Sequence, residues 1–342
     1  MSIMSPRQRV TLTDEIDKIL GLSEDHLESL YERAFKIGRQ VAGNKIGFYA
    51  PGMVHYDTEY YTATNPYRFP SVSITGAACS LNCEHCNGQL LSTMIPAQTP
   101  EELWRVLQRV KDRGGAGCLI SGGSTHRGDV PIANFVQTIA RAKRELGLSI
   151  VVHTGVVYPE TVQLLAEAGI DGAMLDIIGS DDTIREICHL DLKAEAFDRS
   201  MQLLDDYGVP MMPHIVVGLH YGRLHGEANA IRMIAKHRPD SVIVVAFKPL
   251  DGTPMVNTTP PSPVDIAKVM LAIRLTIPDV PLILGCARPH GEHRRTTDIL
   301  ALKSGANGIA YPTEEAYEMA EKMGLEIVMS DKCCSLVAET LR

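Results

Sequence analysis

The alternation of short apolar runs with longer helical stretches is the feature that most constrains how this chain of 342 residues can fold. From about residue 70 onward, eight β-branched or apolar runs are each followed by a segment with helical spacing. The predicted strands are 72–76, 117–121, 149–153, 172–176, 211–217, 242–247, 281–285 and 307–310. The predicted helices lie near 100–113, 131–146, 159–168, 194–207, 223–237, 263–276, 293–304 and 313–323.

This alternation predicts an α/β fold. Successive strands joined by helices form right-handed parallel crossovers, and a closed (β/α)8 barrel of the TIM type leaves no strand edge bare. A doubly wound open sheet is the competing interpretation. In both folds the reactive groups lie where strands give way to helices, so residues directly after strands are the candidates for function.

The two ends of the chain depart from the alternation. Residues 1–70 contain two helical stretches, 12–20 and 24–41, followed by a tyrosine-rich segment. We interpret this part as an N-terminal helical extension packed on a barrel of residues 71–312. Residues 313–342 add a C-terminal helix and a tail that carries cysteines.

Composition and charge exclude several classes of protein. Hydrophobic residues make up 45% of the chain and charged residues 22%, which is typical of a globular protein and not of a disordered one. The formal charge of -8 argues against a nucleic-acid partner bound through its phosphates. No apolar run long enough for a membrane span and no apolar centre of a secretory signal are present, so we expect a cytoplasmic location and no membrane partner.

Three cysteines directly after the first predicted strand are the strongest chemical signal. Cys79, Cys83 and Cys86 have the spacing C-x3-C-x2-C. Three thiolates on a loop between a strand and a helix can converge on a cuboidal iron–sulfur cluster and leave one iron free for a small molecule. A structural zinc site is the alternative, but zinc sites close with four ligands, and no second pair of cysteines follows here.

This spacing after the first strand of an α/β barrel resembles the radical S-adenosylmethionine (SAM) superfamily, in which His85 stands at the place of the usual aromatic residue. The resemblance implies a [4Fe-4S] cluster whose open iron binds SAM. It also implies a low-potential electron donor, because one electron splits SAM to methionine and a 5′-deoxyadenosyl radical.

Other segments resemble the SAM-binding motifs of the same superfamily. The glycine-rich segment at the end of the second strand would meet the methionyl amino group, and an aspartate after the fourth strand would bind the ribose. An arginine in the next helix would pair with the methionyl carboxylate, and the fifth strand would pack on adenine. Alone, each has an ordinary interpretation as a turn or a surface charge. The residues so implied are Gly122, Gly123, Ser124, Asp176, Arg199 and Val217.

The order of these elements, with the closing stretch 302–309, resembles the biotin synthase branch over roughly residues 70–312. Biotin synthase holds a second, smaller cluster with barrel cysteines and an arginine. Here His153 and His214 stand near two of those cysteine places, and Cys118 is about one residue off the third, which turns its side chain to the other face of the strand. We interpret Cys118 and Cys188 as small buried hydrophobic residues.

A second set of cysteines lies elsewhere. Cys286 directly follows the seventh strand, and Cys333 and Cys334 are adjacent in the tail. One thiol at the barrel mouth and two on a tail that folds over it would hold an auxiliary iron–sulfur cluster. The alternative is a mobile tail with spare thiols. The fourth ligand stays open among Ser335, Cys118 and an exogenous sulfide.

Two clusters in one barrel suggest sulfur insertion at an unactivated C–H bond. The layout is similar to the two-protein lipoyl synthases found mainly in archaea, which implies a transferase of lipoate biosynthesis, an octanoylated carrier protein or peptide as substrate and a second radical SAM protein as partner. Four basic residues after the seventh strand would line the mouth or meet an acidic carrier, unless they form a solvated helix start: His290, His293, Arg294 and Arg295.

Two other interpretations stay open. One keeps the radical chemistry and assigns it to hydrogenase maturation, methylornithine formation or biotin synthesis. The other is a non-catalytic barrel that holds a metal structurally. The ordinary bacterial lipoyl synthase is a poorer match, because no cysteine triad stands before Cys79 in this sequence.

Overall fold

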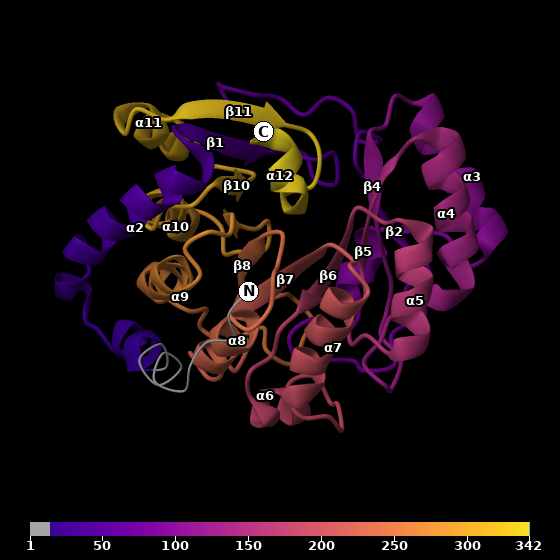
Figure 1. The fold of residues 1–342 in the computed structure, drawn as a ribbon, viewed down its shortest axis with the longest axis horizontal. Helices are drawn as coiled ribbons and strands as arrows, with labels where there is room; N and C mark the ends of the chain where they lie inside the picture. Colours follow the sequence, from indigo (N-terminus) through magenta and orange to yellow (C-terminus); the bar gives the residue numbers. More distant parts are fainter. Residues whose placement is uncertain (1–13, 342) are drawn as a thin grey trace.

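A computed structural model describes residues 14–341, in which one curled parallel sheet carries helices along its outer side (Figure 1). All eight predicted strands are present, within one to three residues at each end. They are β2 (Ser71–Ser73), β4 (Gly117–Ser121), β5 (Ser149–His153), β6 (Gly172–Asp176), β7 (Met211–Val217), β8 (Val242–Ala246), β9 (Leu282–Leu284) and β10 (Gly308–Ala310). The predicted α/β fold is confirmed.

The predicted helices also form in their expected places. Thr99 and Ser262 each start a helix with a reciprocal capping box, in which the hydroxyl accepts a backbone N–H while the acidic residue three positions later reaches back. The short helix α6 (Asp181–Glu186) was not predicted. The others are α3 (Pro100–Asp112), η3 (Ile132–Phe135) with α4 (Val136–Leu146), α5 (Pro159–Ala168), α7 (Glu195–Asp206), α8 (Glu227–Ile234), α9 (Pro263–Thr276), α10 (Glu292–Lys303) and α11 (Glu314–Lys322).

Three further strands extend the sheet beyond the predicted eight: β1 (Lys45–Tyr49), β3 (Ile95–Pro96) and β11 (Glu326–Ser330). The strand order is β11-β1-β10-β9-β8-β7-β6-β5-β4-β2-β3. Strand β1 pairs in parallel with both β10 and β11, so it occupies the edge of β10 that β2 would take in a closed ring of eight. The sheet therefore curls like a barrel, while β3 and β11 remain its two edges among the described residues.

The N-terminal part forms a layer on this sheet. Residues 14–20 are helical, and η1 (Glu24–His26) leads into α2 (Glu28–Ala42), which packs on α9 and α10. The first two residues of the predicted helix 12–20 lie outside the described residues. Gly38 of α2 lets the helix approach closely, because a Cβ there would stand 2.4 Å from the carbonyl oxygen of Gly305.

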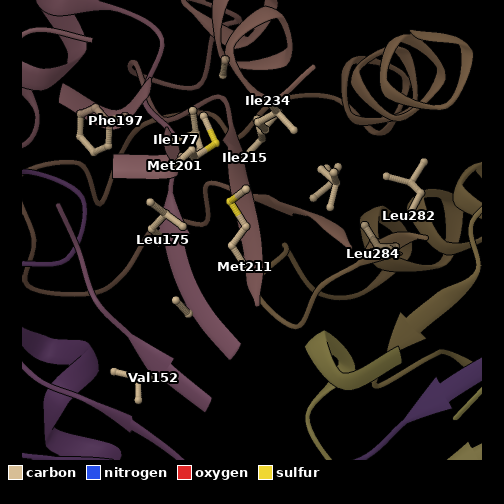
Figure 2. Close-up of a cluster of buried hydrophobic side chains, with 14 of the residues drawn as sticks. Val152, Leu175, Ile177, Phe197, Met201, Met211, Ile215, Ile234, Leu282 and Leu284 are labelled. Atoms are coloured by element: carbon tan, nitrogen blue, oxygen red, sulfur yellow. The ribbon is translucent and has the colours of Figure 1, made fainter. Parts of the chain in front are cut away.

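Two hydrophobic cores lie on opposite faces of the sheet. The larger one fills the space between strands and helices, where side chains such as Leu175, Met211, Ile215 and Phe197 meet (Figure 2). The smaller one lies on the concave face and includes strand residues together with residues of the C-terminal segment. Burial on both faces explains why the strands are continuous apolar runs.

The C-terminal segment enters the concave face. It consists of η4 (Cys334–Leu336) and α12 (Val337–Thr340), and η4 contacts β1, β6 and β10. Leu336 and Val337 are buried there. The alternative of a mobile tail is therefore wrong, because this segment fills part of the barrel interior. None of the helices within residues 14–341 has the length and apolarity needed to cross a membrane.

Candidate active site

The first cysteine set lies on the loop that follows β2. Cys83 is buried, and Cys79 and Cys86 are partly exposed. The backbone N–H of Cys86 donates to the Cys83 carbonyl at 3.2 Å. The thiols of these two residues also form a hydrogen bond, which, with burial, raises the pKa of Cys86 to about 12. The negative charge that Cys79 carries as a thiolate also raises the pKa of Cys83. The structure thus brings the three predicted thiols to one place.

A segment that sequence analysis did not single out holds this loop. The carbonyl of Ile187 accepts the N–H of Glu84 at 2.9 Å, and the Cys83 thiol donates to the Cys188 carbonyl at 3.7 Å. A hydrogen bond with the side chain of Cys188 is the largest cause that raises the pKa of Cys83. The imidazole of His189 binds the Leu81 carbonyl at 2.9 Å and the Glu84 carboxylate at 3.0 Å.

His189 adopts a left-handed backbone conformation, with φ of 55°. Such a conformation is uncommon for a residue other than glycine, and histidine is among the side chains enriched there. The conformation turns the ring toward the cysteine loop. The sequence signal was weak, because a histidine after an unpredicted short helix looks like an ordinary surface residue. Cys188 is buried as predicted, and its position beside Cys83 was not.

The glycine-rich segment after β4 lies directly against the cysteine loop. A Cβ on Gly123 would stand 2.0 Å from the Ala78 carbonyl oxygen and 2.6 Å from the Cys79 Cα, so only glycine fits. The Gly123 N–H donates to the Thr75 hydroxyl at 2.7 Å, and the Ser124 carbonyl accepts from Ser80 at 2.9 Å. The structure therefore joins the predicted SAM segment to the predicted cluster loop.

Two predicted residues of the first site have less defined surroundings. Gly122 packs on Ile74 and Thr75, one residue from the close contact of Gly123. A hydrogen bond with His85 lowers the pKa of the Cys86 thiol and so opposes part of the rise described above. The buried Nδ1 of His85 has no hydrogen-bond partner in the structure. An unpartnered buried nitrogen beside the cysteines fits a site whose bound group supplies the missing acceptor or donor.

No three histidine, cysteine, aspartate or glutamate side chains within residues 14–341 are gathered closely enough to hold a single metal ion. The ligands of a cuboidal cluster bind separate iron atoms, so they need not converge on one point as zinc ligands do.

Asp176 ends β6 on the same side of the sheet as two histidines. The His153 Nε2 lies 3.6 Å from the Asp176 Oδ2, and the rings of His153 and His214 are 6.1 Å apart. His214 donates its Nδ1–H to the Met212 carbonyl, and burial lowers its pKa to about 4, so the ring is neutral at physiological pH. These polar groups interrupt an otherwise apolar face.

Two further predicted SAM-binding residues lie away from the concave face, and their role in SAM binding stays a prediction. The Val217 side chain is fully buried between sheet and helices, because alternation along β7 points it away from the concave face. Its neighbour Val216 lines a small pocket of about 20 Å³ together with Ile177 and Gly179. Arg199 is exposed on α7, and nothing in the structure brings it to the cysteine loop.

The second cysteine set meets on the concave side. Cys333 and Cys334 are buried, whereas Cys286 is exposed. Surrounding protein and the neighbouring Cys333 raise the pKa of Cys286, and the negative charges that Cys333 and Cys286 carry as thiolates raise the pKa of Cys334. A hydrogen bond from Cys334 lowers the pKa of Cys333, whose sulfur also accepts from the Ser335 hydroxyl at 3.1 Å. Residues far apart in the chain thus place three thiols within electrostatic reach of one another.

The remaining candidates around this set differ in position. Cys118 is fully buried in the core between sheet and helices, on the opposite face from Cys333, so it cannot reach the second set. Ser335 lies within reach of that set. Arg288 is also fully buried, where it pairs with Asp298 at 2.8 Å and donates to the carbonyls of Gly285 and Ala310. These bonds fix the loop that carries Cys286.

Comparisons with known proteins agree with this site. Residues 73–223 match the family model of the radical SAM superfamily. The biotin synthase of Allorhizobium ampelinum is 23% identical over 247 residues, which cover 70% of this chain and 74% of that protein. The biotin synthase of Synechococcus elongatus is 23% identical over 266 residues, with coverage of 75% and 81%.

Solved structures show the same fold. A methylornithine synthase (PylB) aligns with a TM-score of 0.63 at 18% identity and covers 96% of each chain. The [FeFe]-hydrogenase maturase HydG aligns with a TM-score of 0.63 at 15% identity, over 98% of this chain and 78% of that one.

The segment that carries the first cysteine loop and the Gly123 segment is thus similar to the radical SAM superfamily, within a fold that solved structures share. The curated proteins to which the chain is similar include biotin synthases, at 23% identity. The superfamily implies a [4Fe-4S] cluster and SAM, for which Cys79, Cys83 and Cys86 and the adjoining Gly123 segment are the matching residues.

Proposed function

We propose that this enzyme inserts sulfur into an unactivated C–H bond of an octanoyl chain on a carrier protein or peptide, as one component of a lipoyl synthase. The observation that supports this proposal is a second set of thiols, in which Cys333 and Cys334 are buried inside the barrel and the exposed Cys286 lies within electrostatic reach of them. Radical chemistry alone needs only the first set, so a second set of soft ligands requires its own explanation.

In this proposal the two sets of cysteines have different roles. When bound, the first cluster with SAM supplies a carbon radical that removes a hydrogen atom, and an auxiliary cluster supplies the sulfur. Cys79, Cys83 and Cys86 hold the first cluster, and the Gly123 segment and Asp176 position SAM. Cys286, Cys333 and Cys334 hold the auxiliary cluster, with Ser335 as a nearby fourth group.

The barrel interior suits an apolar chain. Its concave face is lined by buried aliphatic side chains such as Val151, Met174 and Ile243, which belong to the same apolar cluster as Cys333 and Cys334. Exclusion of water protects a carbon radical from side reactions. A second radical SAM protein is expected as partner, since two sulfur atoms have to be inserted.

The test uses enzyme reconstituted anaerobically with iron and sulfide, reduced, and mixed with SAM and an octanoyl-lysine peptide. Mass spectrometry should show a peptide that has gained one sulfur atom for each hydrogen replaced. Cys333→Ala and Cys286→Ala should abolish this gain while SAM cleavage survives. Cys118→Ala is the matched control, because that cysteine lies on the other face of the sheet.

Iron content gives the same test without turnover. We expect about eight irons per chain in the reconstituted enzyme and about four in Cys333→Ala. Unchanged iron in both Cys333→Ala and Cys286→Ala contradicts the proposed ligation. SAM cleavage without sulfur gain on any octanoyl peptide favours the alternative in which the second site serves electron transfer or cofactor assembly.

A further inference from the structure

Three cationic or basic side chains at the barrel mouth lie close together. Lys248 follows β8, and His290 and Arg294 follow β9. The Lys248 Nζ lies 2.9 Å from the His290 Nε2. Arg294 donates to the Cys286 carbonyl at 3.2 Å, which places the group beside the second cysteine set.

Their surroundings do not neutralise them. Burial, the charge of Arg294 and, for His290, the charge of Lys248 lower the pKa values of Lys248 and His290. Within residues 14–341, no carboxylate forms an ion pair with any member of the group. The acidic group near Arg294 is Asp298, whose two oxygens already accept from Arg288 and from the Thr313 N–H.

Two other buried or partly buried cations are paired with carboxylates: Lys143 binds Asp171 at 2.5 Å, and Arg288 binds Asp298 at 2.8 Å. The Nε of Arg294 is buried and has no hydrogen-bond partner, as is true of Arg39 and Arg274, whose other nitrogens donate to backbone carbonyls or Asn307. Arg294 differs from these two because it lies beside Lys248 and His290. A buried donor without a partner costs free energy, and clustered positive charges add to that cost. Both costs disappear when an anion binds.

Two neighbouring basic residues are already occupied. His293 donates to the Pro261 carbonyl at 2.8 Å, and Arg295 pairs with Glu292 and Glu315. Of the four basic residues that follow β9 in the sequence prediction, only His290 and Arg294 therefore belong to the unpaired group. Lys248, from the preceding strand, was not among the predicted candidates.

We propose that Lys248, His290 and Arg294 bind a carboxylate of the substrate beside Cys286. The free Nε–H of Arg294 and the ammonium of Lys248 supply charge-assisted donors for the two oxygens of one planar carboxylate. The unpaired charges of these residues are the reason to propose an anion site here. That its ligand belongs to the substrate rests on the proposed function, in which the acyl chain enters at this mouth. In an octanoyl-lysine substrate the carboxyl carbon of the chain is an amide, so the carboxylate is an acidic side chain next to the modified lysine; octanoate tests the other source, a free acid that is not yet attached to a carrier.

The test measures dissociation constants with reconstituted, SAM-saturated enzyme. The probes are octanoate against octanamide, and octanoyl-lysine peptides with aspartate against asparagine beside the lysine. The wild type should bind the carboxylate member of one pair about tenfold more tightly, and the pair that shows the preference identifies the source. Lys248→Met and Arg294→Gln should each lose that preference. Arg295→Gln is the matched control and should keep it.

Two binding results would overturn the proposal: no preference for the carboxylate in either pair of probes, or a preference that survives in both variants. A loss of four irons per chain from Lys248→Met and Arg294→Gln would also overturn it, because the cations would then balance the negative charge of the auxiliary cluster. Thermal unfolding of each variant checks that it is folded. If the carboxylate preference holds while no sulfur is transferred, the anion site stands and the proposed function fails.

Discussion

The two cysteine sets differ in how the chain assembles them. Cys79, Cys83 and Cys86 lie on one loop, and their neighbours on other elements, Gly123 and His189, only adjust it. The second set joins Cys286 after β9 to a tail that crosses back into the barrel interior. The first set is thus held by local geometry, while the second depends on the packing of the whole sheet and its C-terminal segment.

The largest expected effect tests whether the first set acts alone in SAM chemistry. Cys83→Ala removes the buried member of that loop and should abolish SAM cleavage, because a cluster with two protein ligands is not retained. Formation of 5′-deoxyadenosine under low-potential reductant is the measurement. Cys334→Ala should keep this activity. A loss of SAM cleavage in both variants would show that the two sets are not separate.

A second prediction tests whether packing of the tail holds the second set. Leu336 is buried on the concave face, and Leu336→Ala should lower the free energy of unfolding by about 2–5 kcal/mol. The tail should also release its share of iron before the first loop does, followed as iron content during chelator treatment. Val54→Ala, at a valine that is 58% exposed, is the control. Simultaneous release from both sites would contradict the comparison.

The smallest expected effect concerns the hydrogen bonds by which His189 holds the first cysteine loop. His189→Asn keeps a residue that tolerates the left-handed backbone and removes the hydrogen bonds of the ring to Leu81 and Glu84. We expect roughly tenfold faster loss of cluster absorbance in air, since each such bond contributes modestly. SAM binding to freshly reconstituted protein should change little. An unchanged rate of absorbance loss would mean that the cysteine loop keeps its conformation without the hydrogen bonds of His189.

The same contrast explains what the sequence could predict. The C-x3-C-x2-C spacing and the position of Gly123 were predictable, because both depend on residues close to one strand end. The approach of Cys286 to Cys333 was predicted from one thiol at the barrel mouth and two on the tail, and it required the tail to fold over the mouth, which spacing does not show. The contact of His189 with the cysteine loop was missed for a related reason. It depends on α6, a helix of six residues that is too short to show a clear helical spacing of apolar residues.

Strand β1 shows a different limit. Its apolar run, Lys45–Tyr49, was visible in the sequence, but it follows a helical extension and its pairing partner β11 lies almost 300 residues later. The barrel type could be predicted from the eight regular repeats, and the extra strands at its edge could not. Val217 was predicted on the strand where it lies, but the sequence did not show which face of β7 its side chain occupies, because that depends on the pleat.

The late position of Cys333 and Cys334 has a consequence for synthesis on the ribosome. The loop that carries the first three thiols and the β4 segment that supports it emerge early, and domains begin to fold from the N-terminus as the nascent chain lengthens. Cys333 and Cys334 leave the ribosome after both the first loop and Cys286, so the second set of thiols is completed later than the first. Under the proposed function, the auxiliary cluster would therefore be assembled after the first one.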